Sequence, residues 1–96
     1  MIVLDCTKLT TESYLLYLHD KGFRFNDENI AFIYFGRSLT NASEAIVNLS
    51  IELTIMSKKT FDGSYYISIL ETLLDHRITN RKAGIKLAYD KGILVG

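Results

Sequence analysis

The chain has 96 residues, of which 48% are hydrophobic and 23% charged, close to the average of globular proteins. This composition excludes intrinsic disorder, and the length predicts one domain, residues 1–96, with a single core. Eleven basic residues balance eleven acidic ones, so the chain carries little repulsion against self-association. Its one cysteine, Cys6, excludes an internal disulfide and a thiolate metal site.

The chain begins with a short apolar run, Ile2–Leu4, which predicts a buried strand. Asp5 interrupts this run, so it is too short for the core of a signal peptide. No apolar run approaches the ~20 residues that cross a bilayer. We therefore expect a cytoplasmic protein without membrane contact. Ile outnumbers Val by eleven to three, which indicates an AT-rich genome such as that of a low-GC bacterium or a phage.

The first predicted helix has clear signals at both ends. Thr10 or Thr11 suits its N-cap, and the segment ends at Gly22, a residue typical of the position after a helix C-cap. Phe23 would then contact Leu18 in a Schellman motif.

The middle of the chain is ambiguous between strand and helix. Residues 30–35 form a continuous apolar run that suits a buried strand or a buried helix. From residue 47 to residue 55, apolar and polar residues alternate strictly, which is typical of a half-buried strand. The alternative is a helix that begins at a capping box formed by residues 41–44. Because β-branched residues are frequent in this stretch and disfavour a helix, we favour the strand.

The last third of the chain predicts a turn, two helices and a closing strand. Residues 58–64 form the turn, and helical spacing of apolar residues follows from 66 to 76. Asn80 caps the last helix, Gly92 ends it, and residues 93–95 form the strand. The resulting order, β-α-β-β-α-α-(β), predicts an α+β fold. An all-α bundle of four to five short helices is the alternative.

Catalytic and metal-binding patterns are not recognisable in the sequence. His19 and His76 each have an aspartate neighbour, but adjacent residues of a helix point about 100° apart and form no ready dyad. Neither histidine stands at ligand spacing from the other or from Cys6. The glycines are scattered and form no phosphate-binding loop. We therefore expect a protein that is not an enzyme and holds no metal or cofactor.

Aromatic residues are concentrated in the centre of the chain, in greater number than a small core readily covers. Tyrosine is favoured at protein interfaces because it combines a large apolar area with a polar tip. Our main hypothesis is a binding or regulatory protein, similar to an inhibitor or antidote, that contacts another protein or forms a homo-oligomer. The predicted interface residues are Tyr34, Phe61, Tyr65 and Tyr66.

The charge distribution supports an alternative hypothesis, a small nucleic-acid-binding regulator. Residues 1–76 carry a net charge of −4, whereas residues 77–96 carry +4. The predicted helix, short break and second helix also have the proportions of a helix-turn-helix. The predicted nucleic-acid contacts are Arg77, Thr79, Asn80, Arg81, Lys82 and Lys86.

Overall fold

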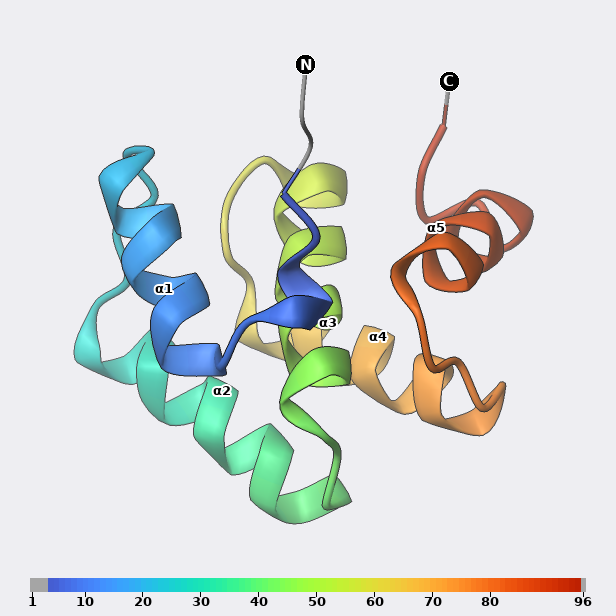
Figure 1. Ribbon diagram of the computed structural model, residues 1–96, viewed down its shortest axis with the longest axis horizontal. Helices are drawn as coiled ribbons and strands as arrows, with labels where there is room; N and C mark the ends of the chain where they lie inside the picture. Colours follow the sequence, from blue (N-terminus) through green and yellow to red (C-terminus); the bar gives the residue numbers. More distant parts are fainter. Residues whose placement is uncertain (1–3, 96) are drawn as a thin grey trace.

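The computed structural model describes residues 4–95, which fold into five α-helices and one turn of 3-10 helix (Figure 1). In chain order they are η1 (Cys6–Lys8), α1 (Thr11–Asp20), α2 (Asp27–Thr40), α3 (Glu44–Lys58), α4 (Gly63–Asp75) and α5 (Arg81–Asp90). These residues contain no strand, so the predicted α+β fold is wrong and the alternative of an all-α bundle is confirmed. Of the predicted first strand, Ile2 and Val3 lie outside the described residues.

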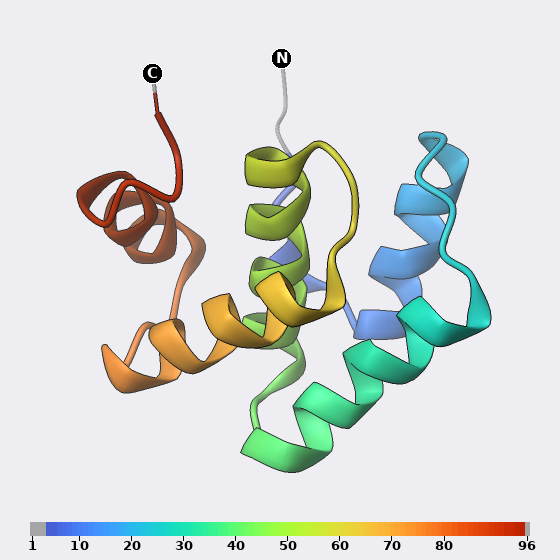
Figure 2. The ribbon, with the colours of Figure 1, turned by 180° about the vertical axis from the view of Figure 1, so that it is seen from behind.

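Helix α3 forms the centre of the bundle. It stands between α1 and α2 on one side and α5 on the other, and α4 crosses behind it (Figures 1 and 2). Every residue from Ile46 to Ile51 and from Leu53 to Ile55 is buried. A helix that is covered all round has no polar stripe, so its sequence lacks the period that identifies a surface helix.

The alternation that predicted a strand in this segment has a different cause. The hydroxyl groups of Ser50 and Thr54 donate to carbonyl oxygens one turn earlier in α3, over 2.8 and 2.7 Å. The amide nitrogen of Asn48 donates to the carbonyl oxygens of Cys6 and Leu9, over 3.0 and 2.9 Å. Buried polar groups are tolerated when they are hydrogen-bonded, so these side chains lie inside the bundle and mark no solvent face.

Helix ends follow the local capping signals closely. The Schellman motif predicted for α1 is confirmed, because the Phe23 N–H donates to the Leu18 carbonyl over 2.9 Å and Gly22 has φ +95°. Gly92 ends α5 in the same way. Arg77 occupies the equivalent left-handed position after α4, with φ 53°. Thr10 and Asn80 cap helix N-termini at predicted positions. The capping box predicted at residues 41–44 is not formed, because Asn41 is the C-cap of α2 and Ser43 caps α3.

The apolar run at residues 30–35 belongs to α2, which touches the core along a narrow strip. Ile33 and Gly36 are the only buried residues of this helix. Gly36 allows α4 to come close, since a Cβ atom there would lie 2.9 Å from the ring of Tyr66. The Tyr66 hydroxyl donates to the Ile33 carbonyl over 2.8 Å and fixes the two helices together.

The C-terminal segment is also not a strand. Leu94 is buried against the core, and its backbone N–H donates to the Ala88 carbonyl over 3.1 Å. No described helix is long and apolar enough to cross a membrane.

Candidate functional site

Helix α2 exposes more large apolar side chains than the other helices. Tyr34 is 39% exposed, Phe35 56% and Leu39 61%. Leu16, on the neighbouring helix α1, is 62% exposed. We call these four residues the α2 surface. Several large apolar side chains exposed on two neighbouring helices typically mark a site of contact with another molecule, so this surface is the candidate site.

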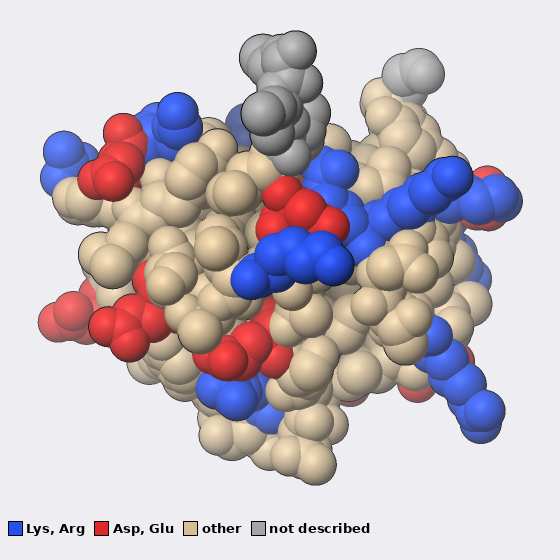
Figure 3. Space-filling view, viewed as in Figure 1, with Lys and Arg blue, Asp and Glu red and all other residues tan. Residues whose placement is uncertain are grey.

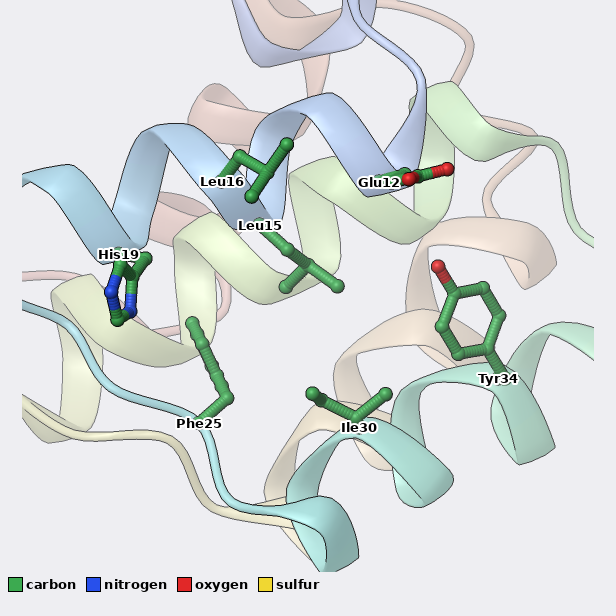
Figure 4. Close-up of a pocket in the computed structure, with 7 residues that line it drawn as sticks. All are labelled: Glu12, Leu15, Leu16, His19, Phe25, Ile30 and Tyr34. Atoms are coloured by element: carbon green, nitrogen blue, oxygen red, sulfur yellow. The ribbon is translucent and has the colours of Figure 1, made fainter.

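One flank of α2 forms a groove with α1 (Figure 4). The groove has a volume of about 380 Å³ and is mainly apolar, with Leu15 of α1 and Ile30 of α2 facing each other across it. Glu12 and Tyr34 lie toward one end, and His19 lies at the other. The full lining is Glu12, Leu15, Leu16, His19, Phe25, Ile30 and Tyr34.

The other flank of α2 carries a second hollow, of about 340 Å³, lined by Glu28, Ala31, Phe32 and Phe35. Phe32 lies flat against the first residue of α4, because a Cβ atom on Gly63 would come within 2.7 Å of its ring. The glycine therefore lets an aromatic ring cover the start of α4 while Phe35 stays outside, in solvent. The apolar surface thus continues around the outward side of α2.

The structure separates two of the predicted interface residues from the surface. Tyr66 is completely buried, and burial raises the pKa of its hydroxyl above the ordinary value. Phe61 is half-buried, with its ring centroid 5.5 Å from those of Phe25 and Tyr66. In this fold both side chains contribute to the core, since residues adjacent to them in space already cover them.

The other two predicted interface residues lie apart from each other. Tyr34 lines the groove between α1 and α2. Tyr65 is half-buried on α4, where its hydroxyl lies 3.0 Å from that of Ser57 and the Lys58 ammonium lies 4.5 Å from its ring centroid. The four residues therefore form no common surface, and only Tyr34 belongs to the candidate site.

Three of the six predicted nucleic-acid residues bond within the protein. The Arg81 guanidinium donates to both carboxylate oxygens of Glu52, over 2.9 and 2.7 Å, and this hydrogen bonding raises the pKa of Arg81. The Asn80 side chain accepts the Ala83 N–H as the helix cap. Lys86 pairs with Asp90 at 3.0 Å in an exposed ion pair. Arg77, Thr79 and Lys82 are exposed.

Helices α4 and α5, which flank the segment between them, do not form a compact pair. Helix α5 packs against α3, where Gly84 leaves no room for a Cβ atom beside Leu49. Carboxylates also interrupt the positive charge. Figure 3 shows acidic side chains enclosed among the basic ones in the middle of this face. The arrangement therefore differs from a helix-turn-helix, whose second helix presents its N-terminus freely.

Glu52 is a partly buried residue of α3 whose contacts were not predicted from the sequence. Its carboxylate accepts from the Cys6 thiol over 3.3 Å as well as from Arg81, and so connects η1, α3 and α5. Burial raises the pKa of Cys6 and keeps the thiol protonated, which suppresses its reactivity as a nucleophile. The available signal was that Glu52 is the only charged residue between Glu44 and Lys58.

Leu16, Phe35 and Leu39 were also missed. Their signal was a mismatch with helical spacing, because each lies off the apolar stripe that faces the core in its own helix. Among the described residues, no group of three His, Cys, Asp or Glu side chains is placed to hold a metal ion.

Comparison with known proteins gives a family and no named relative. No curated protein and no solved structure matches the chain. One family model, described as "Family of unknown function (DUF6123)", matches residues 6–94, from the start of η1 to the buried Leu94 after α5. Because this match covers nearly all of the chain, the protein belongs to that family.

Proposed function

We propose that the protein is a protein-binding module of a regulatory kind, which acts by contact and not by catalysis, and that the α2 surface is its binding site. The observation that carries this proposal is the exposure of Phe35 and Leu39, both more than half exposed on a helix whose only buried residues are Ile33 and Gly36. Burying an exposed apolar side chain against a partner is favourable, because each Å² of apolar area removed from water lowers the free energy by about 25 cal/mol.

The groove between α1 and α2 extends this surface and gives it shape. Its apolar floor with polar groups at both ends is typical of a recognition site, where the apolar part provides affinity and the polar groups provide orientation. The backbone groups of helices α1 and α2 are hydrogen-bonded within each helix, so they offer no edge for an added strand. We therefore expect recognition through side chains.

Affinity capture from a lysate of the encoding organism tests the proposal. The test variant is Phe35→Ser with Leu39→Ser, and the matched control is Tyr89→Ser with Val95→Ser, which changes two exposed apolar residues elsewhere. We expect the parent and the control to retain the same partner and the α2 variant to lose it. Circular dichroism should show equal helix content in all three proteins. Equal capture by the α2 variant and the control would contradict the proposal.

A further inference from the structure

Helices α2 and α4 lie next to each other across the back of the molecule and form a continuous face there (Figure 2). Its apolar part is the outward side of α2, Phe32, Phe35 and Leu39, which recur at helical spacing. Its polar part lies on α4, where Ser64, Ser68, Glu71 and Asp75 are exposed. We call Glu28, Phe32, Phe35, Leu39, Glu71 and Asp75 the α2–α4 face.

The charges on this face are all of one sign. Helix α4 contains no Lys or Arg. The one basic residue of α2, Arg37, is two positions from Phe35 and so points to the opposite side, where it pairs with Glu44 at 3.8 Å. Glu28 lines the hollow beside Phe32 and Phe35. An apolar stripe is therefore bordered by carboxylates with no intervening cation.

These carboxylates also have no partner within the protein. The ion pairs of the described residues are Arg37–Glu44, Arg81–Glu52 and Lys86–Asp90, and none involves Glu28, Glu71 or Asp75. The α2–α4 face thus combines apolar area with negative charge that only an external cation can neutralise.

We propose that the α2–α4 face binds an amphipathic helix of a partner protein whose apolar stripe is flanked by Lys and Arg. This inference rests on the proposed function and names the chemistry of the partner. The outward sides of two adjacent helices suit a third helix, whose ridges fit between theirs. Basic side chains beside the stripe meet Glu28 on α2 and Glu71 or Asp75 on α4, so charge selects the partner and the apolar stripe holds it.

A second copy of the chain is a poorer occupant, although its α5 is basic. The small residues of α5, Gly84 and Ala88, are buried within its own bundle. The free side of α5 therefore offers one exposed aromatic, Tyr89, where a stripe of apolar residues is required.

Fluorescence anisotropy with two labelled peptides tests the inference. One probe is an amphipathic helix of Leu and Lys, and the other has the same Leu positions with Glu in place of Lys. We expect the Leu/Lys peptide to bind and the Leu/Glu peptide to bind at least tenfold more weakly, roughly the effect of a few rim charges. Binding should weaken when salt is raised from about 0.05 to about 0.3 M.

Charge-reversed variants test whether the Leu/Lys peptide binds to the α2–α4 face. Glu28→Lys with Glu71→Lys should weaken Leu/Lys binding about tenfold. The control, Asp20→Lys with Asp90→Lys, makes the same change in net charge at the ends of α1 and α5 and should alter it less than twofold. Equal binding by the two double variants, or equal binding of the two peptides, would overturn the inference.

Two further outcomes separate this inference from the proposed function. If the parent binds neither peptide while Phe35→Ser with Leu39→Ser still abolishes capture, the proposed function stands and the inferred partner chemistry is wrong. If light scattering shows self-association that Glu28→Lys with Glu71→Lys abolishes, the occupant is a second copy, which also overturns the inference.

Discussion

Helices α2 and α3 are consecutive, nearly equal in length and both rich in large apolar residues, yet they differ strongly in how far the rest of the protein buries them. Nine residues of α3 are buried, compared with two of α2. Even the polar side chains of Ser50 and Thr54 in α3 are buried and hydrogen-bonded, whereas α2 leaves aromatic and leucine side chains in water. The difference teaches that hydrophobicity alone does not locate a core. We expect α3 to carry stability and α2 to carry recognition.

The same substitution in the two helices gives the largest expected contrast. Leu53→Ala in α3 removes a side chain that is 0% exposed, so it should lower the free energy of unfolding by about 2–5 kcal/mol. Leu39→Ala in α2 removes one that is 61% exposed and should change it by less than about 0.5 kcal/mol. Urea denaturation of both variants measures the contrast. Similar losses would show that α2 supports the fold as much as α3 does.

Polar residues of α3 provide a second contrast. Asn48→Ala removes the donor to two carbonyl groups near the N-terminus and should lower the free energy of unfolding by about 2 kcal/mol. Ser50→Ala removes a hydroxyl bonded within its own helix and should cost about 1 kcal/mol or less. Denaturant titrations of both variants check this order. The reverse order would mean that Asn48 does not anchor η1 to α3.

Alkaline pH gives the smallest effect and compares a buried tyrosine with an exposed one. Burial raises the pKa of Tyr66, so above about pH 10 the unfolded chain releases this proton and the folded chain retains it. The free energy of unfolding is therefore unaffected by this group below about pH 10. Above that pH it falls as pH rises, by on the order of 1 kcal/mol per pH unit for this group. Tyr66→Phe should reduce the slope. Tyr34→Phe, at an exposed position, should leave it unchanged in denaturation curves measured from pH 9 to 11.

Local features of the fold were predictable from the sequence, and the identity of its central element was not. The Schellman motif at Gly22 and the cap at Asn80 depend on a few neighbouring residues, so their signals are complete in the sequence. The nature of α3 depends on distant partners, because Asn48 is acceptable inside a helix only when η1 supplies carbonyl groups. Single-sequence reasoning does not show those partners, and the alternation therefore predicted a strand.

The candidate site could be predicted only in part for the same reason. Aromatic enrichment drew attention to Tyr34 and Tyr66 alike, but Tyr66 is buried on the inner side of α4, whereas Tyr34 is exposed and lines the groove beside α2. Residues 77–96 do carry a net positive charge, yet the guanidinium of Arg81 is hydrogen-bonded to Glu52, which lies 29 residues away in the sequence. Exposure is a property of the assembled bundle and not of the residue type.

The central position of α3 has a consequence for synthesis of the chain. Its partners lie on both sides of it in sequence, with η1 bonded to Asn48 and α5 packed on Leu49 through Gly84. A nascent chain therefore exposes one side of α3 until Gly84 emerges, about 35 residues later, or roughly 2–7 s at ordinary translation rates. During that interval the helix with the most buried residues is open to chaperones and to other nascent chains. The arrival of α5 closes it.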